Sequence, residues 1–123
     1  CTAAGPGASD DPVALRKLGV ERASQQRFQE AETLLRRSAE AGYFTAQIEL
    51  AYLLESSPAP VQKPMEAYAW YALVLHRGAK GNDKGFAEDG RARVRQSLDA
   101  NSLEEAAREA EALIARLGTK HYP

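Results

Sequence analysis

Apolar residues recur every three or four positions through most of this chain, which is the spacing of an amphipathic α-helix. The clearest example is the stretch 64–78, which reads PMEAYAWYALVLHRG. Pro64 suits a first helical position because its missing N–H would be unpaired there in any case, and Gly78 suits the left-handed residue that often follows a helix end. The apolar positions at helical spacing are Ala67, Trp70, Tyr71, Val74 and Leu75. We therefore predict a helix whose aromatic residues are buried in a core.

This stretch repeats an earlier one, 28–42, which reads FQEAETLLRRSAEAG. At an offset of 36 residues, Glu30-Ala31 aligns with Glu66-Ala67, Leu34-Leu35 with Trp70-Tyr71, and Gly42 with Gly78. A period of roughly 20 to 50 residues is typical of repeat proteins. One helix cannot bury a broad apolar face alone, so the repetition predicts helix pairs that stack on one another.

The same periodicity predicts five further helices, over residues 12–23, 28–41, 43–55, 86–98 and 102–117. Asp11 and Pro12 open the first one, and the prolines within 56–63 make that segment a loop. Gly90 is expected to weaken its helix by roughly 1 kcal/mol relative to alanine. Ser102 and Glu105 have the spacing of a capping box, which places the start of the last helix at Ser102.

Together these elements predict an all-α fold of about six helices in three antiparallel pairs. The helical repeat domain is expected to cover residues 12–118. Residues 1–11 are mostly small and lack apolar periodicity, which predicts a flexible tether. Residues 119–123 follow the last helix and are expected to fray.

The composition is that of an ordinary globular chain. Of 123 residues, 44% are hydrophobic and 27% charged, and the formal net charge is −1, so no global charge attracts nucleic acid or an anionic membrane. No apolar run approaches the roughly 18 residues that a membrane-spanning helix needs. His76 and His121 are the only histidines, and neither has partners at metal-ligand spacing. No serine or cysteine lies in a setting typical of a catalytic nucleophile, so we expect neither an enzyme nor a cofactor or metal site.

The only cysteine is the first residue. Followed by Thr2 and by small residues without apolar periodicity through Asp10, it resembles the mature start of a bacterial lipoprotein, in which the cysteine carries a lipid anchor. By the sorting pattern of enterobacterial lipoproteins, a residue other than aspartate after the cysteine implies the outer membrane. The alternative is a chain boundary that falls on Cys1 by chance. With one cysteine, neither an internal disulfide nor a zinc-type cysteine cluster can form within the chain.

Two stretches carry a resemblance to known repeat families. Leu18-Gly19, Ala31 and Leu35 resemble the tetratricopeptide pattern of a Leu-Gly pair, a small residue where two helices cross, and a bulky residue four positions later. The unit 50–78 resembles the related Sel-one-like repeat, through Leu50-Ala51, Val61, Ala67, Trp70-Tyr71 and Gly78. It departs from that pattern in having Ala51 and Pro60 where the family has glycine.

The resemblance implies a short right-handed α-solenoid that binds a peptide or a partner protein on a concave face, lined by the first helix of each pair. Members of such families act as scaffolds or assembly factors of the bacterial cell envelope, or as immunity proteins that neutralise a periplasmic toxin or secreted effector enzyme. Both alternatives stay open here. With the lipoprotein-like start, they imply a periplasmic protein that contacts the membrane only through Cys1 and does not bind nucleic acid.

For such a solenoid, we predict that the partner-binding positions are Arg16, Val20, Ala23, Gln47, Tyr52, Arg91 and Arg95. An aromatic residue and cations beside small residues suit a peptide or a protein loop better than a small molecule. Arg91 and Arg95 lie one helical turn apart and, with Lys84, could bind an anionic partner. The alternative for them is a solvated helix face, because Glu88 and Asp89 lie nearby.

Overall fold

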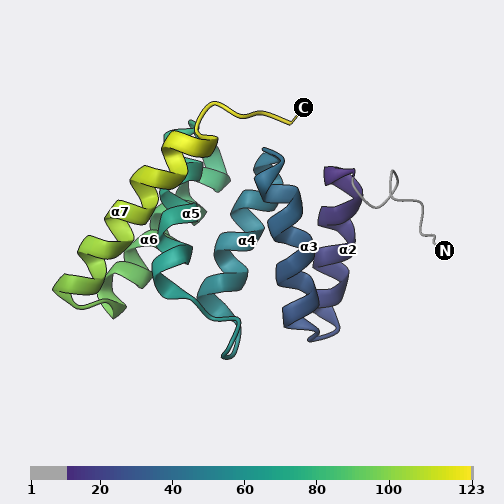
Figure 1. The fold of residues 1–123 in the computed structure, drawn as a ribbon, viewed down its shortest axis with the longest axis horizontal. Helices are drawn as coiled ribbons and strands as arrows, with labels where there is room; N and C mark the ends of the chain where they lie inside the picture. Colours follow the sequence, from purple (N-terminus) through teal and green to yellow (C-terminus); the bar gives the residue numbers. More distant parts are fainter. Residues whose placement is uncertain (1–10, 123) are drawn as a thin grey trace.

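The computed structural model of this protein describes residues 11–122, and the predicted lipid anchor at Cys1 lies outside them. The described chain is all-α and contains six helices, labelled α2 to α7 in Figure 1. They are α2 (Pro12–Ser24), α3 (Phe28–Glu40), α4 (Phe44–Ser56), α5 (Pro64–His76), α6 (Gly81–Ser97) and α7 (Ala100–Leu117). Consecutive helices pack against each other from α2 to α6. The predicted all-α fold of stacked helices is confirmed.

The helix ends follow from local chemistry. The Asp11 carboxylate accepts a hydrogen bond from the Ala14 N–H at 3.2 Å, and so caps α2 as expected. Gly42 and Gly78 follow α3 and α5 with φ of 97° and 90°, which confirms Gly78 in the left-handed region. In α7 the prediction was wrong: the cap is Asp99, which accepts from the Ser102 N–H at 2.8 Å. The helix therefore begins at Ala100, two residues before the expected start.

The core is organised around α5, which packs against α4, α6 and α7. Trp70 and Tyr71 are 1% and 0% exposed, so their predicted place in the core is confirmed. The last helix pair differs from the others because α7 packs on α5 rather than on α6. The reason is the thin apolar face of α6, whose buried positions are only Ala87, Gly90 and Val94.

Gly90 has a different role from the one its helix propensity suggests. A Cβ atom built on Gly90 would lie 2.3 Å from Cζ and 2.6 Å from Oη of Tyr71. Because Gly90 has no side chain, the Tyr71 ring fits between α5 and α6. Gly90 lowers the intrinsic propensity of its helix, but alanine would not fit there.

The segment after α7 runs back toward the α3–α4 end of the stack (Figure 1). The Tyr122 N–H donates to the Gly42 carbonyl at 3.1 Å, and the Tyr122 hydroxyl donates to Asp11 Oδ1 at 2.8 Å. His121 Nδ1 lies 2.8 Å from Nη2 of Arg77. Residues 120–122 are therefore held by contacts to α2, α5 and the α3–α4 turn, rather than frayed as the sequence predicted.

Candidate partner-binding face

The first helices of the three pairs, α2, α4 and α6, run in the same direction and meet along one side of the stack (Figure 1). An ion pair joins α2 to α4: Arg16 Nε donates to Glu49 Oε1 at 2.6 Å, and Nη2 donates to Oε2 at 2.5 Å. A second pair joins α4 to α6, because Arg93 Nε donates to Glu55 Oε2 at 2.7 Å. These ion pairs link the three helices on one side of the stack.

Between the two ion pairs lies a patch of exposed apolar side chains, Val20, Tyr52 and Phe86, which we call the aromatic patch. Their exposed fractions are 37%, 48% and 39%. The rings of Tyr52 and Phe86 come from different helices, and their centroids are 5.6 Å apart. Val20 is one turn beyond Arg16 on α2, as Tyr52 is one turn beyond Glu49 on α4, so the two residues lie at the same level.

The aromatic patch rests on a rigid support. The Phe86 ring meets the buried Tyr71 ring edge-on, with centroids 6.2 Å apart. The Tyr71 hydroxyl donates to Glu55 Oε1 at 2.6 Å, which also accepts from Arg93 Nη2 at 3.1 Å. Burial opposes ionisation of Glu55, but the hydrogen bonds from Arg93 and Tyr71 outweigh it and hold the pKa of Glu55 below its ordinary value. Phe86 is therefore backed by a fixed core residue and a charged hydrogen-bond network.

Three of the predicted binding residues lie on this face: Arg16, Val20 and Tyr52. Ala23 is half-buried, one turn beyond Val20 on α2. Gln47 is fully buried, so the prediction that it faces a groove was wrong. Its Nε2 donates to the Ala39 carbonyl at 3.1 Å, and its Oε1 accepts from Arg77 at 2.7 Å. A buried amide that satisfies two internal partners stabilises the fold and is not available to a ligand.

Arg91 and Arg95 do not share the face either. Residues two apart on a helix differ by about 200° around its axis. Because Arg93 contacts α4, both Arg91 and Arg95 point away from α4 and from the aromatic patch. The prediction that they line one wall with Tyr52 was therefore wrong.

Sequence reasoning missed Phe86 and Arg93 as members of this face. Both lie on the α4 side of α6, seven residues and two turns apart. One signal was present in the sequence: Phe86 is the only aromatic residue in α6, which is otherwise strongly polar. The direction in which it points depends on Gly90, whose close approach to Tyr71 sets the rotation of α6 about its axis.

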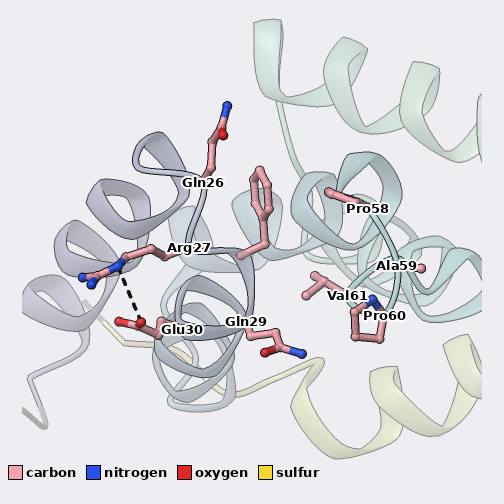
Figure 2. A pocket seen from close by; sticks show the side chains of 9 residues that line it. Gln26, Arg27, Gln29, Glu30, Pro58, Ala59, Pro60 and Val61 are labelled. Atoms are coloured by element: carbon pink, nitrogen blue, oxygen red, sulfur yellow. Dashed lines mark ion pairs between the residues drawn. The ribbon is translucent and has the colours of Figure 1, made fainter.

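A separate hollow of about 300 Å³ lies at one end of the stack, between the α2–α3 turn and the α4–α5 loop (Figure 2). Arg27 and Glu30 point toward each other on one side, with Nε and Oε2 3.7 Å apart, and Pro58, Pro60 and Val61 form the other side. The lining holds no histidine, cysteine or hydroxyl side chain. It therefore offers packing surface, side-chain amides and the Arg27–Glu30 ion pair.

Within residues 11–122 there is no group of three or more His, Cys, Asp or Glu side chains placed to hold a metal ion. No helix in the same range is long and apolar enough to cross a bilayer.

Comparisons with protein-family models, with curated proteins and with solved structures find no match to this chain.

Proposed function

We propose that this protein is a non-enzymatic interaction module that binds a loop or an extended segment of a partner protein on its α2–α4–α6 side. The observation that carries the proposal is the pair of half-exposed rings, Tyr52 and Phe86, held together at 5.6 Å between two helices. Aromatic side chains that stay exposed on a rigid support are the type most often found at the energetic centre of protein interfaces.

The ion pairs beside the aromatic patch favour the same function. Arg16 and Glu49, and Arg93 and Glu55, neutralise each other across the helices, so the face presents apolar surface within a polar rim. The ion pairs and Tyr71 hold the Tyr52 and Phe86 rings in place before a partner binds. The loss of side-chain conformational entropy on binding is therefore small. The patch lies open on the surface, which suits a polypeptide better than a small molecule that needs enclosure.

We propose further that the module acts in the bacterial cell envelope, tethered through a lipid on Cys1 to the outer membrane. The support is the lipoprotein-like start of the sequence alone. Mass spectrometry of the protein purified from its own cells tests it. We expect a diacylglyceryl and N-acyl adduct on Cys1, and an unmodified Cys1 would refute the anchor while leaving the binding face untouched.

The binding proposal is tested in two stages. First, the tagged protein captures its partner from envelope extract, and the purified partner is titrated to give Kd. Then Tyr52→Ala and Phe86→Ala are combined. Since an interface aromatic at a hot spot contributes on the order of 2 kcal/mol or more, the double variant should weaken Kd by at least about 10²-fold.

The matched control is Arg95→Glu, which changes an exposed residue on the far side of the same helix and should leave Kd unchanged. Circular dichroism and Trp70 emission must show that all variants are folded. Binding that survives in the double variant, or is lost only in the control, would refute the assignment of the face. Assaying a captured enzyme with and without the module would separate a scaffold from an inhibitor: only the inhibitor lowers the enzyme's activity.

A further inference from the structure

A second surface lies between α5 and α7, and none of its lining residues belongs to the aromatic patch. Two adjoining hollows of about 210 and 290 Å³ open there, and Glu66 and Glu109 line both. The remaining lining residues are Lys63, Pro64, Met65, Ala69, Trp70, Ala112, Leu113 and Arg116. We call this surface the α5–α7 groove. Its lining is largely apolar, and Glu109 lies where the two hollows meet.

The cations around the groove already have partners. Arg36 on α3 contacts Glu66 and also pairs with Glu32, at 2.8 Å from Nη2 to Oε2. The Lys63 Nζ donates to the same Glu32 oxygen at 2.8 Å. Arg116, at the other end of the groove, pairs with Glu40 on α3. Glu66 also accepts from the Trp70 Nε1–H at 3.1 Å, so its negative charge is well compensated.

Glu109 is different. Its carboxylate forms no ion pair or hydrogen bond with any residue in the described range 11–122. Burial, then the charge of Glu66, then that of Glu105, raise the pKa of Glu109 above its ordinary value. The groove therefore combines a largely apolar lining with an exposed carboxylate that has no ion-pair partner in the described range 11–122.

We propose that the α5–α7 groove binds a lysine or arginine side chain presented by a partner protein. The aliphatic stem of such a side chain would cover Met65 and Leu113, and its cationic head would meet Glu109. Charge complementarity selects a cation, and the apolar lining selects one with a hydrocarbon stem. A bare metal ion fits less well, because no three acidic or histidine ligands converge there in the described chain. This inference is independent of the aromatic patch.

The test uses the whole chain and a blocked peptide, acetyl-Ala-Lys-Ala-amide, followed by two-dimensional NMR. The indole N–H of Trp70 gives a single local reporter, because it is the only tryptophan and lines the groove. We expect titration with the peptide to shift this signal and the amides of Glu109 and Ala112. The same peptide with an acetylated lysine side chain should cause no shift.

Glu109→Gln keeps the size of the side chain and removes its charge, so the shifts should disappear. Glu111→Gln is the matched control, because Glu111 is exposed and points about 200° away on the same helix, and it should behave like the wild type. Tyr52→Ala/Phe86→Ala should also bind the peptide normally, which separates this test from that of the proposed function. The Trp70 emission of each variant verifies that it is folded.

Three results would overturn the inference. The first is unchanged binding by Glu109→Gln, or no shift at all in the wild type. The second is stronger binding of the small diamine cadaverine than of the peptide, which would indicate a small-amine site. The third is self-association of the wild type that Glu109→Gln abolishes, which would make a second copy of the chain the occupant.

Discussion

Replacing Gly90 by alanine is the sharpest test of how this fold is packed. An alanine Cβ would lie 2.3 Å from Tyr71 Cζ and 2.7 Å from Cε1, well inside van der Waals contact. Tyr71 cannot simply swing aside, because it is fully buried and its hydroxyl hydrogen-bonds to Glu55 at 2.6 Å. Either α6 moves away from α5, or the Tyr71 ring leaves its hydrogen bond.

The magnitude follows from three contributions. Overpacking costs about 1–3 kcal/mol. Losing a buried hydrogen bond to a charged group costs about 1.5–3 kcal/mol. Against these stands the gain of about 1 kcal/mol from replacing glycine by alanine within a helix. Taking the middle of each range, we expect Gly90→Ala to lower the free energy of unfolding by about 3 kcal/mol.

The assay is urea unfolding followed by Trp70 emission and by circular dichroism. With an m-value of about 2 kcal/mol per M, the expected loss moves the midpoint down by about 1–2 M. Gly85→Ala is the matched control, because Gly85 lies in the same helix and a Cβ there would meet nothing within 4 Å. It should stabilise the protein by about 0.5–1 kcal/mol. If Gly90→Ala proved as stable as Gly85→Ala, the close packing of α6 on Tyr71 would be refuted.

Three further perturbations test other parts of the structure. Trp70→Ala should cost about 3–5 kcal/mol in urea unfolding, because it empties a fully buried site in α5, and a loss below about 1 kcal/mol would contradict that burial. Burial opposes the ionisation of Glu66 and Glu32, but their hydrogen bonds to cations hold the pKa of each below its ordinary value, so the folded state binds fewer protons than the unfolded chain. Their contribution to stability should therefore be present at neutral pH and lost as the pH falls below about 4.3, and Glu66→Gln should lose less stability than the wild type over that range. Tyr122→Phe removes the hydrogen bond to Asp11 and should speed amide exchange at residues 120–122; unchanged exchange would show that the hydroxyl does not hold the tail.

The candidate face was predictable only in part. Arg16, Val20 and Tyr52 could be placed from their spacing, because each lies on the first helix of its pair. Arg91 and Arg95 could not be placed in this way. The buried positions of α6 are only Ala87, Gly90 and Val94, and so few small residues do not show in the sequence which side of α6 faces the core. Gln47 is misleading in the sequence because a polar residue normally indicates an exposed position. Here the side chain is buried, and Arg77 and the Ala39 carbonyl satisfy its hydrogen bonds inside the fold.

The sequence by itself determined the helices and most of their ends. Proline at a helix start, glycine just after a helix end and apolar residues at a period near 3.6 act within a few neighbouring residues, so they can be interpreted without a fold. Burial of Trp70 and Tyr71 followed in the same way, since no helix with so broad an apolar face can remain exposed.

Tertiary structure alone decided the contacts between residues far apart in the chain. Gly90 makes room for Tyr71, Phe86 meets Tyr52, and Tyr122 reaches Asp11 across almost the whole chain. It also placed α7 on α5 rather than on α6, and left the Glu109 carboxylate without an ion-pair partner in the α5–α7 groove. These features depend on the rotation and offset of packed helices, which are set by shape complementarity among many side chains at once and leave no local signature.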